Sequence, residues 1–384
     1  MIKKKIALFY PWIKSKGGAE SVLLEILKNK DYDIDLYTWV YDAKNSFEEF
    51  KQYNIKVISP KIAEKLSRTY ILRSLFLPLS LFSKIDLENY DTFLIYTSGL
   101  GEFITFRNYK PGKTYAYVNT PLRANCNEIK KWNLKYRYKS FLSKSFYLLA
   151  ANIYGLLEKI AWKRINKAIF ISNLGLERAK EKNLLKNKKS GVVYVPINLD
   201  RFKKLKPKKG NYFLYVSRFS VDKRQDVLIK TWSKFVEKHP KYKLVLAGGM
   251  ENKKYFEKIK LLAKKTKNIE IKTNVKNKEL LKLYQNCLAG IFVPFMEDFG
   301  IVPFEILSTG KPLIVVNTGG YVNLIKKHSQ VLWVKEKYDS KLMEDEIYKS
   351  LEKFLNLKFS YKKINFKDLS LINFKKNLDK VILK

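Results

Sequence analysis

Short apolar segments alternate with amphipathic helical patterns along the chain. The segments have the length of buried strands, and the stretches between them carry apolar residues every three or four positions, as on one face of a helix. This alternation predicts parallel sheets in two α/β halves. The expected strands lie at residues 6–10, 34–40, 55–58, 90–96, 113–118 and 168–172 in the first half, and at 212–216, 242–247, 269–271 and 289–295 in the second.

A length of 384 residues is sufficient for two domains of ordinary size. Residues 203–210 are rich in lysine and contain Pro207 and Gly210, which is typical of an interdomain linker. We therefore expect a first domain at residues 1–202, a second at 211–360 and a C-terminal helix or tail at 361–384.

Two segments interrupt the alternation, an apolar one at residues 70–82 and a longer one at 135–165. Within the second, apolar residues follow helical spacing, and basic residues surround them. Two interpretations stay open: a core helix packed on the sheet, which we favour, and an amphipathic helix on an anionic membrane surface. Both can hold for different faces. The apolar positions are Leu142, Phe146, Leu149, Ile153, Leu156 and Ile160, and the basic ones are Lys135, Arg137, Lys139, Lys144, Lys159, Lys163 and Arg164.

The charge is strongly positive, with 76 basic and 36 acidic residues and a formal net charge of +40. Such an excess indicates an anionic partner, which could be nucleic acid, anionic lipid or a phosphorylated substrate. Because the lysines are spread along the chain, they do not form the concentrated platform expected of a nucleic-acid-binding protein, and we expect no nucleic-acid partner.

Targeting signals are weak. The apolar run after Lys3-Lys4-Lys5 is short and has no small-residue cleavage site, so we expect a first strand rather than a signal peptide. No uncharged run reaches the roughly 18 residues of a membrane-spanning helix. Cys126 and Cys287 fall in different predicted domains and are expected to be free thiols in a reducing cytoplasm.

The segment at residues 297–305, EDFGIVPFE, is the strongest candidate site. It follows the apolar run at 289–295 and leads into a predicted helix, so that Glu297 lies at the strand end and Glu305 one to two turns into the helix. Ligands of open α/β sheets bind at this edge. Backbone amides near Gly300 and Ile301 suit an anion or sugar hydroxyls.

Two further strand-to-helix turns carry candidate ligand-binding groups. Gly17-Gly18 follows the first strand and allows close backbone approach to a ligand, although it is not a dinucleotide-binding fingerprint. Arg218 and Lys223 follow the strand at 212–216; a guanidinium grips two phosphate oxygens, while an ammonium acts as a point charge. Arg224 is a secondary phosphate candidate.

Together these motifs resemble the retaining GT-B glycosyltransferases of the family-four type, also called glycosyl transferases group 1. The family's Glu–seven residues–Glu motif matches Glu297 and Glu305, with Phe299, Gly300 and Ile301 inside it and Gly310 and Pro312 after it. Residues 17–20, 115–123, 192–202 and 218–223 resemble further family motifs. The chain departs from them at Asn119, where the family has His, at Ser217, where Gly is common, and around Asn198, where the usual Gly is missing.

The resemblance implies an α/β GT-B fold, with two Rossmann-like parallel-sheet domains facing across a cleft. It implies an acceptor-binding first domain, a nucleotide-sugar-binding second domain, and a last helix that packs back on the first domain. The implied catalytic residues are Glu297 on the donor sugar, Arg218 and Lys223 on the diphosphate, and Asn119. The implied donor-binding residues are Gly17, Gly18, Asn274, Val275, Phe299, Gly300, Ile301, Val302 and Glu305, the last of these on the ribose; Arg123 is the candidate acceptor-binding residue.

Leaving-group stabilisation is the chemistry that these residues offer. Negative charge develops on the β-phosphate as the sugar–diphosphate bond breaks, and fixed cations near it contribute several kcal/mol. Asn119 cannot titrate, which fits a front-face retaining mechanism in which the departing phosphate takes the acceptor's proton. His239 and His328 form no metal-ligand pattern, so we expect neither metal nor cofactor.

We therefore expect a retaining, metal-independent hexosyltransferase at the inner face of the cell membrane. Its donor would be a GDP-sugar or UDP-sugar, with mannose the first choice and glucose the second, and its acceptor a glycan or lipid-linked glycan. The alternatives are a non-catalytic GT-B partner subunit that binds sugar nucleotides, a basic nucleic-acid-binding protein, and a GT-B epimerase or phosphorylase, for which no cofactor-lysine pattern is present. The sequence predicts no oligomeric state.

Overall fold

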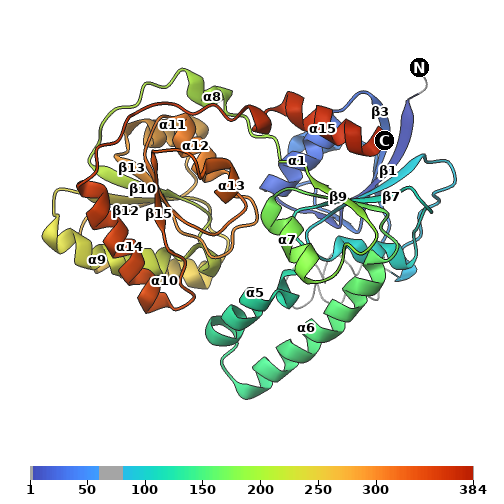
Figure 1. The fold of residues 1–384 in the computed structure, drawn as a ribbon, viewed down its shortest axis with the longest axis horizontal. Helices are drawn as coiled ribbons and strands as arrows, with labels where there is room; N and C mark the ends of the chain where they lie inside the picture. The colour runs from blue at the N-terminus through green and yellow to red at the C-terminus, as the bar shows by residue number, and fades with distance from the viewer. Residues whose placement is uncertain (1–2, 60–80, 384) are drawn as a thin grey trace. The chain divides into compact units, whose positions relative to one another are not determined.

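The computed structural model describes residues 3–59 and 81–383. The chain forms two compact units: unit 1 comprises Met1–Pro196 and Leu371–Lys384, and unit 2 comprises Ile197–Ser370 (Figure 1). Unit 2 begins before the predicted linker, because the Ile197 amide donates to the Leu369 carbonyl at 2.9 Å. The apolar segment predicted at residues 70–82 lies outside the described residues except for Leu81 and Phe82.

Unit 1 is built on a seven-stranded sheet in the order β5-β3-β1-β6-β7-β8-β9. All its pairings are parallel, as predicted. The strands are β1 (Lys4–Phe9), β3 (Tyr32–Thr38), β5 (Ile55–Val57), β6 (Thr92–Thr97), β7 (Thr114–Val118), β8 (Lys167–Phe170) and β9 (Lys189–Val192), and a small parallel pair is formed by β2 (Trp12–Ile13) and β4 (Val40–Tyr41).

Helices connect these strands and cover the sheet (Figure 1). They are α1 (Gly18–Leu27), α5 (Asn127–Trp132), α6 (Phe141–Trp162), α7 (Asn173–Glu181) and α15 (Leu371–Leu383), with shorter turns η1 (Glu48–Gln52), η2 (Gly101–Phe106), η3 (Arg123–Asn125) and η4 (Asn133–Arg137). The last helix belongs to unit 1, where the Tyr32 hydroxyl donates to Asp379 at 2.6 Å. The buried core includes Phe9, Trp39 and Phe93, and both cysteines are buried free thiols.

Unit 2 contains a six-stranded parallel sheet in the order β12-β11-β10-β13-β14-β15. Its core centres on Phe213, whose ring meets those of Trp232 and Phe235 edge-on. The strands are β10 (Tyr212–Val216), β11 (Lys243–Ala247), β12 (Ile269–Lys272), β13 (Ala289–Phe292), β14 (Leu313–Val316) and β15 (Val331–Val334). The helices are α8 (Asp200–Lys203), α9 (Gln225–Lys238), α10 (Lys253–Lys264), α11 (Asn277–Asn286), α12 (Val302–Ser308), α13 (Val322–Ile325) and α14 (Ser340–Leu355), with turns η5 (Val221–Lys223) and η6 (Lys367–Leu369).

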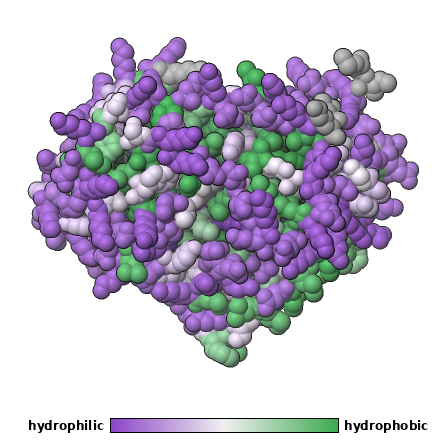
Figure 2. All heavy atoms as spheres, viewed as in Figure 1, coloured by the Kyte–Doolittle hydropathy of each residue, from purple (hydrophilic) through white to green (hydrophobic). Residues whose placement is uncertain are grey.

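Helix α6 exists as predicted, but its predicted core stripe is exposed. Leu142 is 79% exposed, Phe146 68% and Leu156 62%, and Figure 2 shows hydrophobic side chains along the outer edge where α6 lies. The core interpretation of this stripe is therefore wrong. The helix packs on unit 1 through another face, which carries small residues that permit close approach. The buried residues of α6 are Tyr147, Ala151, Gly155, Glu158, Ala161 and Trp162.

Candidate active site

The strand order of unit 2 reverses between β10 and β13, and residues that follow these strands lie at their carboxyl ends. The chain leaves β10 toward β11 on one side and later returns to form β13 on the other. Ligands of doubly wound sheets bind where the strand order reverses in this way. Arg218 and Lys223 follow β10, and Glu297 follows β13, so the topology brings these three predicted residues to one edge of the sheet.

Lys223 and Glu297 form a direct ion pair at this edge of the sheet. The Lys223 Nζ lies 2.6 Å from Glu297 Oε2 and 3.2 Å from Asp222 Oδ2, and the lysine is only 9% exposed. Burial alone would lower the pKa of the Lys223 ammonium, but the charges of Glu297 and Asp222 outweigh burial and raise this pKa above its ordinary value. The site therefore holds a fixed, permanently charged ammonium.

Arg218 has a more accessible guanidinium. Its side chain is 64% exposed, and its Nη1 lies 2.9 Å from Glu251 Oε1. The loop itself is fixed, because the Gln225 side-chain amide donates to the Arg218 carbonyl at 2.9 Å and to Ser217 Oγ at 2.8 Å. A fixed backbone with an exposed guanidinium suits a phosphate that enters from solvent.

Arg224, the secondary phosphate candidate, instead stabilises unit 2. It has a left-handed backbone with φ of 54° and is 5% exposed. Its Nη2 lies 2.8 Å from Glu336 Oε1, and its guanidinium carbon lies 5.0 Å from the centre of the Phe295 ring. This buried pairing commits the Arg224 side chain to the interior of the unit.

The turn between Glu297 and α12 depends on Gly300. Its φ is 80°, and a Cβ atom there would lie 2.6 Å from a carbon of the Tyr321 ring. Both the backbone conformation and the space therefore require glycine. Phe299 anchors the turn against Phe304, with ring centres 5.5 Å apart. Ile301 and Val302 follow where α12 begins, and the amides of a helix's first turn have no partners within that helix.

Glu305 is buried and already has partners on both carboxylate oxygens. Its Oε2 accepts from the Tyr284 hydroxyl at 2.5 Å, and its Oε1 pairs with the Arg201 guanidinium. Burial raises the pKa of Glu305 even though Arg201 opposes this shift, and burial together with Glu305 raises the pKa of Tyr284. A carboxylate oxygen has a second lone pair for a ribose hydroxyl.

Arg201 and Tyr284 are the residues that sequence reasoning missed at this site. Arg201 lies 104 positions before Glu305, so no local pattern connects them. The segment at 192–202 resembled a family motif, but nothing in it indicated a partner for Glu305. Tyr284, a buried residue of α11, likewise cannot be distinguished in the sequence from an ordinary core tyrosine.

The loop after β12 holds the remaining predicted donor-binding residues of unit 2. Asn274 has a left-handed backbone with φ of 54°, and Val275 follows it. The loop lies at the same carboxyl edge as Lys223 and Glu297 but follows the outermost strand of the sheet. Its position and exposed backbone suit contact with a base rather than with a phosphate.

In unit 1, the predicted residues also gather at the carboxyl edge. Gly17 is the residue before α1, and Asn119 directly follows β7. The Asn119 side chain is fixed: its Nδ2 donates to Ser98 Oγ at 2.8 Å, and its Oδ1 accepts from the Tyr96 hydroxyl at 3.1 Å. The order of the sheet reverses between β1 and β6, so Gly17, Gly18 and Ser98 flank the switch point of this unit.

The loop that carries Arg123 is held by a buried charge cluster. The Leu122 amide donates to Glu158 Oε1 at 2.7 Å, and Lys182 pairs with Glu158 and donates to the Leu122 carbonyl at 3.1 Å. Glu102 lies fully buried nearby, bonded to Thr97 Oγ1 at 2.7 Å. Burial, reinforced by the charge of Glu158, raises the pKa of Glu102 to about 7. Arg123 itself is partly buried in η3.

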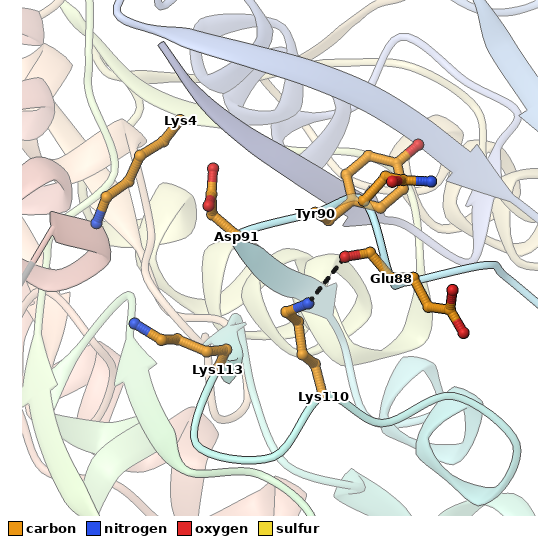
Figure 3. A pocket seen from close by; sticks show the side chains of 7 residues that line it. Lys4, Glu88, Tyr90, Asp91, Lys110 and Lys113 are labelled. Carbon is orange, nitrogen blue, oxygen red and sulfur yellow. Dashed lines mark hydrogen bonds between the residues drawn. The ribbon is translucent and has the colours of Figure 1, made fainter. Parts of the chain in front are cut away.

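A pocket of about 380 Å³ in unit 1 lies away from these residues. Its lining includes Lys4, the first residue of β1, together with Tyr90 and Asp91 before β6 and Lys110 and Lys113 before β7. Figure 3 shows these side chains around an opening in which Lys110 donates to the Glu88 carbonyl at 3.4 Å. This is the amino-terminal edge of the sheet, opposite the edge that carries Gly17 and Asn119.

Among residues 3–59 and 81–383, no group of three or more His, Cys, Asp or Glu side chains is placed to hold a metal ion. Within the same residues, no helix combines the length and the apolar character needed to cross a membrane.

Sequence comparisons identify related proteins for most of the chain. Residues 196–364 match the model of the family described as Glycosyl transferases group 1. The chain is 23% identical over 366 residues to the GDP-Man:Man(3)GlcNAc(2)-PP-Dol alpha-1,2-mannosyltransferase of Homo sapiens, with 82% of this chain and 73% of that protein covered. It is 22% identical over 369 residues to the alpha-1,3/1,6-mannosyltransferase ALG2 of Kluyveromyces lactis, with coverages of 85% and 72%.

Solved structures share the fold at low sequence identity. The lipopolysaccharide outer core galactosyltransferase WaaB aligns with a TM-score of 0.65 and 16% identity, covering 99% of both chains. The sucrose-phosphate synthase of Thermosynechococcus elongatus aligns with a TM-score of 0.67 and 16% identity, covering 99% of this chain and 95% of that one. These likenesses show that the chain, with its two parallel-sheet units, has the GT-B fold.

Proposed function

Residues 196–364 of this chain are a glycosyl transferases group 1 domain, within a chain of GT-B fold, and from that premise we propose a retaining hexosyltransferase. It transfers a hexose from a nucleotide diphosphate sugar to a glycan or lipid-linked acceptor. The observation that carries the proposal is the ion pair between the buried Lys223 and Glu297, at the same edge of the sheet as the exposed Arg218 and at the switch point of unit 2.

The two cations stabilise the leaving diphosphate. An ammonium has three N–H donors, and Lys223 directs two of them at Glu297 and Asp222, which leaves the third for a phosphate oxygen. Arg218 adds an accessible guanidinium that exchanges Glu251 for phosphate. Fixed cations where charge develops contribute several kcal/mol to such a step, and these residues perform that role without a metal ion.

Glu297 binds the hydroxyls of the donor sugar while Lys223 holds its carboxylate in place. This contact couples the sugar-binding group directly to the phosphate-binding group. Glu305 binds the ribose through its remaining lone pairs, with Arg201 and Tyr284 fixing its orientation. The loop with Asn274 and Val275 contacts the base. The backbone from Phe299 to Val302 completes this part of the donor site.

Unit 1 supplies polar groups but no titratable base at the position of Asn119. Its amide is held by Ser98 and Tyr96, and an amide cannot accept the acceptor's proton at neutral pH. We therefore assign proton acceptance to the departing phosphate, on the same face of the sugar as the incoming acceptor. Attack from that face retains the anomeric configuration. The backbone of Gly17 and Gly18 offers further N–H donors, at the switch point of unit 1.

The donor is GDP-mannose as first choice and UDP-glucose as second. The support for mannose comes from the two mannosyltransferase relatives, one of which is named for a GDP-Man donor and a PP-Dol-linked glycan. A diphosphate-linked acceptor also fits the formal charge of +40, and Arg123 is the proposed contact for it. Such an acceptor places the enzyme at the cytoplasmic face of a membrane, as a peripheral protein.

Thermal-shift screening with GDP-mannose, UDP-glucose and an ADP-sugar tests the donor first. The proposal expects one nucleotide sugar to raise the melting temperature of wild-type protein but not of the variant Lys223→Met. Transfer is then measured by release of the nucleoside diphosphate in the presence of a lipid diphosphate glycan. Donor binding without turnover on any acceptor would favour the non-catalytic partner subunit, and a salt-sensitive DNA shift without nucleotide binding would favour the nucleic-acid alternative.

A further inference from the structure

Helix α6 has two apolar faces, and among the residues that the structure describes one of them is buried within unit 1. The buried face carries Ala151 and Gly155; a Cβ atom on Gly155 would lie 2.1 Å from Asn125 Nδ2, so the helix approaches η3 closely. The opposite face carries a stripe, here called the α6 stripe, that remains exposed. Its members are Leu142, Phe146, Leu149, Ile153, Leu156 and Ile160, with exposures from 42% to 79%.

The α6 stripe is narrow and continuous. At 3.6 residues per turn, its six positions fall within an arc of about 80° and extend over roughly 27 Å of helix. Single exposed apolar residues are ordinary on protein surfaces, whereas a contiguous row of large ones marks an interaction site. Phe141, which is 82% exposed at the start of the helix, extends the apolar surface.

The exposed charges of α6 and of its flanking residues are positive. Glu158 is the single acidic residue between Glu128 and Glu177 in the sequence, and it is buried and paired with Lys182. Exposed basic residues stand at both ends of the helix, so α6 and its flanks combine exposed apolar side chains with exposed positive charge. These basic residues are Lys135, Arg137 and Lys139 before α6, and Lys159, Lys163 and Arg164 at its end.

We propose that the α6 stripe docks the protein onto an anionic phospholipid surface, with α6 lying in the plane of the headgroups. An apolar face buried at the acyl boundary, flanked by basic residues at headgroup level, is how interfacial helices bind membranes. A second copy of the chain fits this face less well, because its α6 would bring the same positive charges into contact. The α6 stripe would thus be the surface through which the protein binds the membrane. This inference rests on the peripheral membrane location included in the proposed function.

The same helix positions the candidate acceptor loop. Glu158, on the buried side of α6, accepts from the Leu122 amide, and Arg123 follows directly. Docking through the α6 stripe therefore fixes the Arg123 loop with respect to the lipid surface.

Vesicle co-sedimentation tests the docking surface without donor or acceptor. Wild-type protein is mixed with vesicles of phosphatidylcholine alone, or with about one third phosphatidylglycerol, at low and at raised salt. We expect binding to the anionic vesicles only, weakened by salt. The stripe variant Phe146→Ser/Leu149→Ser/Ile153→Ser should bind at least about tenfold more weakly. Lys135→Glu/Lys139→Glu/Lys163→Glu should bind about a hundredfold more weakly.

Matched control variants distinguish binding through the α6 stripe from nonspecific hydrophobic or electrostatic binding elsewhere on the protein. Leu261→Ser/Leu342→Ser/Ile372→Ser removes three exposed apolar residues from other helices, with exposures of 63%, 53% and 78%. Lys253→Glu/Lys264→Glu/Lys267→Glu reverses three exposed lysines of unit 2. Both controls should bind as the wild type does within a factor of about two to three, apart from the general effect of net charge.

The outcomes are distinct. Wild-type protein that ignores anionic vesicles, or a stripe variant that binds them unchanged, would overturn the assignment. A wild-type dimer that becomes monomeric in the stripe variant, measured by light scattering, would assign the face to a second copy instead and also overturn it. Because lipid binding is read without sugar transfer, a failed transferase assay leaves this result intact, and a soluble glycan acceptor should be used equally well by wild type and stripe variant.

Discussion

The buried ammonium of Lys223 permits a quantitative test of the donor site through the variant Lys223→Met. Methionine keeps much of the side-chain length and removes the charge. It leaves Glu297 and Asp222 without the cation that lies 2.6 Å and 3.2 Å from them. The perturbation therefore acts on stability and on catalysis, and the two effects can be measured separately.

The expected loss of stability is moderate. Breaking a fully buried ion pair costs about 3–5 kcal/mol, because one charge stays buried without its partner. Here the Glu297 and Asp222 side chains are 21% and 36% exposed, so water compensates part of the cost. We expect a loss of about 1–3 kcal/mol in the free energy of unfolding, measured by chemical denaturation without donor.

The expected loss of turnover is larger. Removal of one preorganised group that stabilises developing charge costs about 10²- to 10³-fold in kcat. We expect Lys223→Met to lose kcat by that factor at saturating donor, while the folded fraction at the assay temperature stays above nine tenths. Turnover is followed by release of the nucleoside diphosphate, and donor affinity by calorimetry.

Lys258→Met is the matched control. Lys258 also pairs with a carboxylate at 2.6 Å, that of Asp226, but its side chain is 52% exposed. An exposed pair contributes about 0–1 kcal/mol, and Lys258 lies on α10, outside the loops that carry Lys223 and Glu297. A Lys223→Met enzyme with kcat within threefold of the wild type would refute the assignment of Lys223 to the leaving diphosphate.

Three further predictions concern the turn, Glu305 and the buried carboxyl cluster. Gly300→Ala should destabilise unit 2 by about 2–4 kcal/mol, because φ is 80° and the new Cβ meets Tyr321. The control Gly249→Ala, whose Cβ would meet nothing within 4 Å, should change stability by less than about 0.5 kcal/mol. Equal losses of stability in the two variants, measured by calorimetry, would contradict the role given to Gly300. Tyr284→Phe should lower the free energy of unfolding by about 1–3 kcal/mol, because it removes a hydrogen bond to the Glu305 carboxylate. In a double-mutant cycle this effect should not be additive with that of Arg201→Leu. Simple additivity would show that Tyr284, Arg201 and Glu305 do not act together. Glu102→Gln should remove a pH dependence of stability, because the pKa of Glu102 is raised from 4.5 to about 7 in the folded state. The wild type therefore loses stability as the pH rises from 4.5 to 7. Above about pH 7 the whole loss in the free energy of unfolding is present, on the order of 3 kcal/mol. Urea denaturation at pH 5 and pH 8 should therefore show the variant gaining on the wild type at pH 8, and a constant difference would argue against a protonated Glu102.

The sheets were predictable because buried parallel strands appear in the sequence as continuous apolar runs. Every expected strand in the described residues is present, with ends shifted by a few positions. The candidate turns were also predictable, since residues that follow parallel strands necessarily gather at one edge. Lys223 and Glu297, 74 positions apart, meet for this reason.

Other features depend on contacts that no local pattern encodes. Arg224 was a phosphate candidate from its neighbours in sequence, but Glu336 pairs with it inside unit 2. Arg201 is a basic residue among many, and only the fold brings it to Glu305. The two residues look alike in the sequence, and only the distant carboxylate that each one reaches distinguishes its role.

Helix α6 shows how periodicity alone can mislead. The large apolar residues have helical spacing, and the usual inference is that such a stripe packs in the core. The structure instead packs α6 through the face with Ala151 and Gly155, whose small side chains carry little hydrophobic signal. The feature of the sequence that indicated a membrane surface instead was the excess of basic residues on both sides of the stripe, with a single acidic residue among them.

The anomeric configuration of the product tests the central claim most directly. Purified protein is incubated with donor labelled at the anomeric carbon and a lipid diphosphate glycan, and the new linkage is read by NMR. The account predicts a glycosidic bond with the same anomeric configuration as the donor, formed by wild type and lost with Lys223→Met. A product of inverted configuration, or hydrolysis of the donor with no glycosidic product on any acceptor, would contradict it.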